Sequence, residues 1–172
     1  MTNILRTLIM ATHLVGVFAM PAMAGEILLK FKGGIGVIPV SSAAGTQNAD
    51  GTFPNVNRND VRGVAPGGQP WVIESLKADV TVDGRIRVDG RGLLLSGGNG
   101  IGTTGGQQVR AVLFCGPVPG FTTHSSGLVA LEPDGDFRID DVLDSTPPNP
   151  CGTPVLLIVS GGGRWFAAGI PQ

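Results

Sequence analysis

Glycine and proline recur along the whole chain, and their density limits its fold more than any other feature. The sequence contains 28 glycines and 13 prolines among 172 residues. Because both residues break helices, a chain this rich in them does not build long helices. With 42% hydrophobic residues, the chain is also too apolar to stay disordered. We therefore expect many turns between short strands.

Apolar and polar residues alternate with a period of two wherever the sequence shows any period. Residues 41–70 are the exception, because they are polar and predict a long loop with at most one short strand. The pattern predicts an all-β fold, an antiparallel β-sandwich of about seven to nine strands with the general architecture of immunoglobulin-like domains. The expected strands lie within 26–40, with a break at Gly33-Gly34, and at 72–82, 85–95, 109–115, 127–131, 136–142, 155–160 and 164–168.

Two Asp-Gly turns fix the expected register of two hairpins. A two-residue loop at Asp83-Gly84 would place apolar and charged side chains on one face. A three-residue loop at 82–84, with the glycine in the left-handed position of a bulge, instead pairs Val80 with Ile86. The same reasoning for 133–135 predicts the pairs Leu131 with Phe137 and Val129 with Ile139.

Residues 82–89 and 133–140 also resemble each other in sequence, each with an Asp-Gly turn followed by alternating apolar and charged residues. Two interpretations of this resemblance remain open. The resemblance can reflect two duplicated halves of the domain. It can equally reflect the fact that any two hairpins with Asp-Gly turns look alike.

The first 24 residues have the pattern of a secretory signal peptide. Arg6 provides positive charge, residues 8–20 are mainly apolar, and Ala22-Met23-Ala24 matches the small-x-small cleavage pattern. The apolar stretch is too short for a membrane span. We expect cleavage after residue 24, a single domain over residues 25–172 without a transmembrane segment, and a periplasmic or extracellular location.

Cys115 and Cys151 are the two cysteines of the chain. Two cysteines in an exported protein are most simply explained by one disulfide. A redox pair or a metal site is disfavoured, because the chain has no CxxC motif and too few partner ligands.

Carboxylates gather around the second Asp-Gly turn. Asp134, Asp136 and Asp140 form a hypothetical calcium site, since calcium prefers oxygen ligands and would relieve the repulsion between close carboxylates. The alternative is that these side chains are simply solvated. A carboxylate-dependent hydrolase would need some of them, with Asp144, to converge in one cleft.

Other candidate features favour structural interpretations. His124 is interpreted as a solvated loop histidine, because no nucleophile and orienting carboxylate accompany it in sequence. Residues 100–105 match GxGxxG by chance, since a strand follows them and no helix does. Trp71 is either a lid on the core or a platform for a ligand. An outward row of arginines, interleaved with Asp79 and Asp89, is expected to be solvated: Arg85, Arg87, Arg91 and Arg110.

The formal net charge of −1 gives no electrostatic signature of nucleic-acid binding. These observations favour an exported, noncatalytic binding or structural module, with a protein or glycan as partner and no cofactor other than calcium. The alternatives are a secreted hydrolase that uses carboxylates and a calcium-stabilised adhesion-type module.

Overall fold

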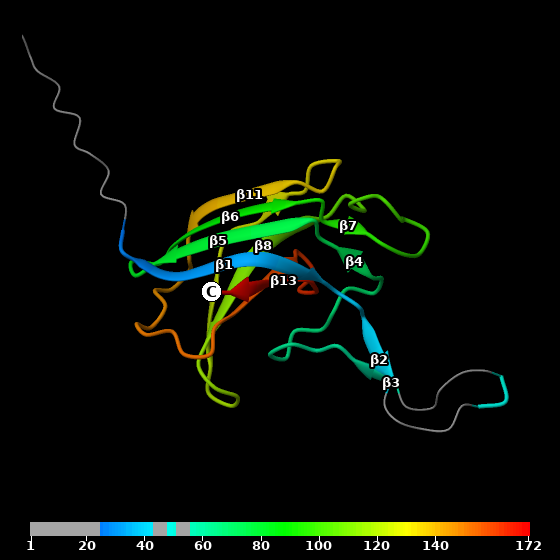
Figure 1. Ribbon diagram of the computed structural model, residues 1–172, viewed down its shortest axis with the longest axis horizontal. Helices are drawn as coiled ribbons and strands as arrows, with labels where there is room; N and C mark the ends of the chain where they lie inside the picture. Colours follow the sequence, from blue (N-terminus) through cyan, green and yellow to red (C-terminus); the bar gives the residue numbers. More distant parts are fainter. Residues whose placement is uncertain (1–24, 43–47, 51–55) are drawn as a thin grey trace, which may run out of the picture.

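The computed structural model describes residues 25–42, 48–50 and 56–172, and these residues confirm the all-β class (Figure 1). No helix occurs within those ranges, and none of their segments is a helix able to cross a membrane. The predicted signal peptide lies outside the described residues. Residues 43–47 and 51–55 of the predicted polar loop also lie outside them.

Thirteen strands occur in the described part of the chain. They are β1 (Ile27–Gly36), β2 (Val40–Ser42), β3 (Val56–Arg58), β4 (Trp71–Val72), β5 (Ser75–Thr81), β6 (Arg85–Arg91), β7 (Leu94–Leu95), β8 (Gln108–Cys115), β9 (Thr122–Ser125), β10 (Val129–Ala130), β11 (Phe137–Val142), β12 (Val155–Ser160) and β13 (Trp165–Pro171). The predicted strand at 155–160 is confirmed at both ends. The predicted strands at 72–82 and 85–95 each divide into a long and a short strand.

Nine of these strands form one curled antiparallel sheet (Figure 1). Its order is β10, β8, β12, β13, β1, β5, β6 and β11, and β9 also pairs with β8. Two separate sheets are therefore not confirmed, because backbone pairing through β13, β1 and β5 is continuous. The curl encloses one apolar core, to which strands from both ends of the sheet contribute.

The first Asp-Gly turn has the predicted bulged geometry. Val80 pairs with Ile86, and Gly84 has a φ of 85° and donates from its N–H to the Thr81 carbonyl at 3.0 Å. The register of the β5–β6 hairpin was therefore readable from the alternation around the turn.

The second turn is bulged as predicted, but the strand pairing expected beyond it is wrong. Gly135 has a φ of 86° and donates to the Glu132 carbonyl at 2.8 Å. Val129 then pairs with Val109 in β8, whereas Phe137 pairs with Gly90 in β6. The segments that flank this turn thus belong to opposite edges of the sheet. The two similar sequences consequently take different structural roles.

The outer faces of the sheet divide it into two regions. We call β5, β6 and β11 the charged half, because their outward side chains are mostly charged and exposed. We call β8, β12 and β13 the covered half, because outward residues there are also buried. In this half Val112 and Phe114 of β8 and Leu157 of β12 are at most 5% exposed.

Residues 59–67, here called the cover segment, lie against the covered half. The Trp165 N–H donates to the Ala65 carbonyl at 3.1 Å, and the Gly67 N–H donates to the Trp165 carbonyl at 3.0 Å. The Trp165 indole Nε1–H also donates to the Asn59 carbonyl at 2.9 Å. Val61 and Val64 pack against the core. Part of the predicted polar loop is therefore an ordered second layer.

Trp71 is a lid on the core. Its ring stacks on Phe166, with the ring centroids 4.0 Å apart and an interplanar angle of 14°. Both side chains are buried, as is that of Trp165. Trp165 and Phe166 are consecutive residues of β13 and point to opposite faces of the sheet. Both are buried because Trp71 and the cover segment supply a second layer.

The predicted disulfide is present between Cys115 and Cys151, whose Cα atoms are 4.9 Å apart. It joins the end of β8 to the segment just before β12, and β8 and β12 are neighbouring strands of the covered half. An intramolecular disulfide is typical of proteins that fold in an oxidising, exported environment.

Candidate binding groove

The three carboxylates of the calcium hypothesis each have a partner within the fold. Asp134 Oδ1 accepts a hydrogen bond from the Asp136 N–H, and Asp136 Oδ1 accepts one from the Gly92 N–H, both at 3.0 Å. Asp140 Oδ2 lies 3.3 Å from Arg87 Nε. Within the described residues, no group of three or more histidine, cysteine, aspartate or glutamate side chains is placed to hold a metal ion. Calcium binding stays a prediction.

Two further aspartates join the edges of the curled sheet. Asp141 Oδ2 accepts from the Gly127 N–H at 2.7 Å, and Asp144 Oδ1 accepts from the Ser125 N–H at 3.0 Å. The Asp144 N–H returns a hydrogen bond to the Ser125 carbonyl at 2.9 Å. We call these three bonds the seam, since they join β11 and the residues after it to the edge formed by β9 and β10. These carboxylates thus have an architectural role.

The interpretation of His124 as a solvated loop residue is wrong. The residue lies in β9, is 4% exposed and pairs with Leu113 of β8. Its Nε2 lies 2.8 Å from Thr122 Oγ1, and its Nδ1 lies 2.8 Å from Ser145 Oγ. β9 was not predicted, because its residues Thr-Thr-His-Ser have no apolar alternation. Pairing with β8 places the imidazole on the inner face, and neither cavity described below is lined by it.

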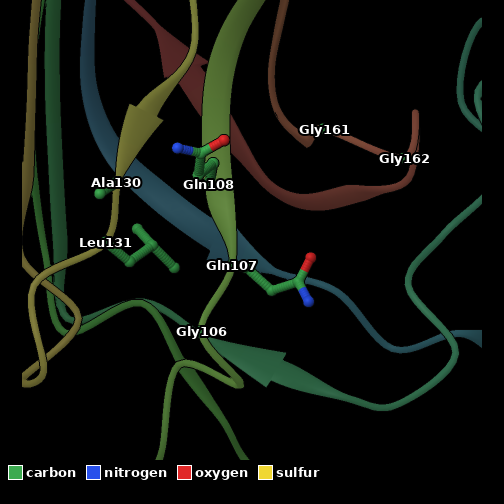
Figure 2. A pocket seen from close by; sticks show the side chains of 7 residues that line it. All are labelled: Gly106, Gln107, Gln108, Ala130, Leu131, Gly161 and Gly162. Carbon is green, nitrogen blue, oxygen red and sulfur yellow. The ribbon is translucent and has the colours of Figure 1, made fainter.

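A first cavity, of about 430 Å³, lies between β10 and the turn that joins β12 to β13 (Figure 2). Its lining contains no charged and no aromatic side chain. The lining residues are Gly106, Gln107, Gln108, Ala130, Leu131, Gly161 and Gly162. The GxGxxG match at 100–105 lies in turns shortly before β8, and no helix follows it. This cavity offers mainly backbone and amide groups, which recognise many ligands weakly.

A second cavity, of about 320 Å³, is an open groove between the cover segment and the outer face of β8, β9 and β12. We call it the arginine groove. Its lining combines two arginines with two hydroxyls and an apolar floor. The residues that matter below are Arg62, Val64, Arg110, Val112, Phe114, Phe121, Thr123, Ser125 and Val159.

Arg62 occupies the tip of a two-residue hairpin. Val61 and Val64 exchange backbone hydrogen bonds of 3.0 and 2.9 Å, and Arg62 and Gly63 have φ values of 54° and 77°. Positive φ at both positions defines a type I′ turn, whose first position favours asparagine, aspartate or glycine. An arginine there costs stability, of the order of 1 kcal/mol. Backbone strain at a residue that lines a groove is a feature often found at functional sites.

The guanidinium of Arg62 is held in place at the rim of the groove. Its Nη2 donates to the Thr153 carbonyl at 2.9 Å, and its Cζ lies 5.3 Å from the centre of the Phe121 ring. Its Nη1 is buried and has no hydrogen-bond partner. The side chain is therefore fixed while one of its donors stays unused.

Arg110 contributes a second unused donor. Its Nε is also buried without a hydrogen-bond partner. A buried N–H without an acceptor typically costs about 1 to 3 kcal/mol. The predicted outward row of arginines is wrong in this respect, because Arg110 lies in the covered half and apart from Arg85 and Arg87 on β6.

Sequence reasoning missed the arginine groove, although two signals for it were present. Arg110 is the one charged residue in the otherwise apolar stretch from Val109 to Cys115. Arg62-Gly63 between two valines has the spacing of a two-residue hairpin. What the sequence does not contain is the contact between these segments, which are far apart along the chain.

No family model, curated protein or solved structure matches this chain.

Proposed function

We propose that this protein is an exported, noncatalytic binding module whose ligand occupies the arginine groove. The observation that carries the proposal is an open groove lined by two arginines, Arg62 and Arg110, each of which also has one buried guanidinium N–H donor without a partner. Buried polar groups in folded proteins almost always have partners, so two orphans in one groove favour a missing ligand. Ligand sites typically combine a mainly apolar lining with a small number of polar groups that point toward the ligand.

Export is proposed from two independent features. Residues 1–24 have the charge and hydrophobicity pattern of a cleaved signal peptide. The disulfide between Cys115 and Cys151 suits an oxidising compartment, either periplasmic or extracellular. We further propose that the curled sheet acts as a sandwich-like pair of layers, comparable in general architecture to immunoglobulin-like domains.

The hydrolase alternative receives less support from the geometry. Such an enzyme needs two carboxylates that face one cleft. No aspartate or glutamate of the described residues lines either cavity. The calcium-stabilised module is tested directly by melting temperature, because calcium that binds the folded state raises it. A higher melting temperature in calcium than in chelator would support a site at Asp134, Asp136 and Asp140, and an unchanged melting temperature would exclude it.

Arrays of glycans and peptides, probed with the labelled domain from residue 25 to 172, test the binding function. We expect the ligands that bind wild type to lose most of their signal with Arg110→Gln. The matched control is Arg91→Gln, which removes an exposed arginine from β6 and should leave the signal unchanged. Equal binding by wild type and Arg110→Gln would place the ligand elsewhere and overturn the proposal.

Export is tested separately by expression of the full chain in a secreting bacterial host. We expect the product to appear outside the cytoplasm and its amino terminus to be Gly25 by mass spectrometry. A product that keeps residues 1–24 and stays in the cytoplasm would contradict the export part alone.

A further inference from the structure

The charge of the arginine groove is unbalanced. Two arginines line it, and no carboxylate of the described residues does. Four other described arginines, Arg58, Arg85, Arg87 and Arg138, lie 3.0 to 3.8 Å from a carboxylate oxygen, whereas the exposed Arg91 and Arg164 do not. Arg62 and Arg110 form no such ion pair within the described residues. The groove is thus locally positive on a chain whose net charge is slightly negative.

The unused donors belong to groups that prefer oxyanions. A guanidinium stays charged in proteins and carries five N–H donors in a planar fork. That fork matches the oxygens of a carboxylate or a phosphate, often with two parallel hydrogen bonds. A neutral acceptor would satisfy Arg62 Nη1 or Arg110 Nε, but it would leave the charge of the groove uncompensated.

Arg62 is arranged for binding before any ligand arrives. Its backbone is fixed by the hairpin between Val61 and Val64, and its Nη2 is anchored on Thr153. Phe121 supports the guanidinium from one side. A side chain that is already immobile loses little conformational entropy on binding, so its contacts contribute more to affinity.

The floor of the groove is apolar and partly aromatic. Val112, Phe114 and Val159 form it but are at most 5% exposed, so the accessible apolar surface is that of the half-buried Val64 and Phe121. Phe121 contacts Phe114 edge to face with their ring centroids 5.4 Å apart. A ligand that carries an apolar or aromatic group beside its charge would use both parts of the groove.

We infer that the arginine groove recognises an oxyanion, either a carboxylate or a phosphate, attached to an apolar or aromatic group. The inference rests on the proposed function, since it names the chemical class of the ligand in the proposed site. Arg62 and Arg110 bind the oxyanion, the hydroxyl-bearing Thr123 and Ser125 lie beside it, and Phe121 packs against the apolar part.

Titrations of the isotope-labelled domain with small probes, followed by NMR, test this inference. The probes are benzoate, phenyl phosphate, acetate, inorganic phosphate and the neutral benzamide, each up to about 50 mM, a range in which fragments of this size bind. We expect benzoate or phenyl phosphate to shift the amide signals of Thr123 and Ser125. The better of the two should bind about tenfold more tightly than benzamide, because it forms charge-assisted hydrogen bonds. The two aromatic anions distinguish carboxylate from phosphate.

Variants connect the binding to the two arginines. Arg110→Gln and Arg62→Gln should each weaken the better anion by about tenfold, the effect of one charge-assisted hydrogen bond. Arg62→Lys keeps the charge but not the fork, and should also weaken binding. Arg91→Gln is the control and should bind as wild type does. Melting temperatures close to wild type will show that the variants are folded.

The outcomes separate this inference from the proposed function. Equal binding of benzamide and benzoate at the groove would overturn the oxyanion inference and leave the groove as a binding site. An absence of any shift at the groove, together with array binding that Arg110→Gln does not change, would overturn both. Anion binding that survives Arg110→Gln and Arg62→Gln would also overturn the inference.

Discussion

The charged half and the covered half resemble each other on the inner face of the sheet and differ on the outer face. In the charged half, inward Ala78 and Val80 alternate with exposed Lys77 and Asp79. In the covered half, five consecutive residues of β12 from Leu156 onwards are buried. The first pattern is that of a sheet with one solvated face, and the second is that of a strand enclosed on both sides.

The candidate site lies on the outer face of the sheet, where the two halves differ. The charged half neutralises its surface with ion pairs between neighbouring strands, such as those of Arg85 and Arg87 with Asp140. The covered half instead accepts the cover segment, and the gap left between the two layers is the arginine groove. A second layer thus creates a cavity that a single solvated sheet face does not have.

A charge placed on the buried outer face of the covered half should have the greatest effect. Leu157→Asp should destabilise the domain by more than about 5 kcal/mol, because it buries a carboxylate without a partner. Since that variant can fail to fold, Leu157→Ala is the second measurement, with an expected loss of about 2 to 5 kcal/mol in urea denaturation. On the charged half, Lys77→Ala should stay within about 0.5 kcal/mol of wild type. Similar losses for Leu157→Ala and Lys77→Ala would remove the distinction between the halves.

Loss of the disulfide should affect the covered half more than the charged half. Cys115→Ala with Cys151→Ala opens a loop with a sequence separation of 36 residues. A loop of that length corresponds to about 3 to 4 kcal/mol of chain entropy. We expect this loss in urea denaturation, and faster hydrogen exchange in β8 and β12 than in β5 and β6. An equal increase in the hydrogen-exchange rate of all four strands would show that the disulfide stabilises the two halves equally.

The seam should contribute a smaller amount, because its bonds are exposed. Asp141→Ala with Asp144→Ala removes two carboxylates that accept hydrogen bonds from Gly127 and Ser125. The expected loss is about 2 kcal/mol in thermal or urea denaturation. As a control, Asp140→Asn removes two exposed ion pairs and should cost about 1 kcal/mol or less. If the control costs as much as the double variant, the seam has no special role.

The smallest expected effect lies at the turn of the charged half. The Thr81 hydroxyl hydrogen-bonds Asp83 and holds the pKa of that exposed carboxyl below its ordinary value of 3.8. A lowered folded-state pKa gives stability that is present above about pH 4 and lost as the pH falls through the folded-state value. The advantage of wild type over Asp83→Asn should therefore shrink in acid, and it should be smaller in a Thr81→Val background, where only the weaker contributions of the Arg85 and Asp83 backbone and the Arg85 charge remain. An advantage that grows in acid would contradict the assigned cause.

The parts of the fold that depend on neighbouring residues were predictable. The alternation around Asp83-Gly84 predicted the β5–β6 register. The apolar run from Val155 to Ser160 predicted both the first and the last residue of β12. The pairing of Val129 and Phe137 was not predictable, because their partners lie in strands whose positions depend on the whole sheet. The cysteine pair was predictable because the chain has no other cysteine with which either could bond.

The candidate site was less predictable than the fold. Arg62 is anchored on Thr153, 91 residues away, and nothing local to either residue indicates that contact. The aspartates at the second turn looked like a ligand cluster because they are close in sequence. Asp134 and Asp136 precede β11 and accept hydrogen bonds from backbone N–H groups of the turn and of Gly92, whereas Asp140 lies within β11 and pairs with Arg85 and Arg87.

The seam also bears on how the protein behaves at high concentration. A sheet with free edges presents unpaired backbone groups that strands from other molecules can extend, and this is a common route to aggregation. Here the two outermost edges face each other and are bridged by Asp141 and Asp144, with the Glu132 N–H bonded to the Asp136 carbonyl nearby. The carboxylates of Asp141 and Asp144 therefore join the two edges of the sheet, and their negative charge also disfavours pairing of these edges with strands of other molecules.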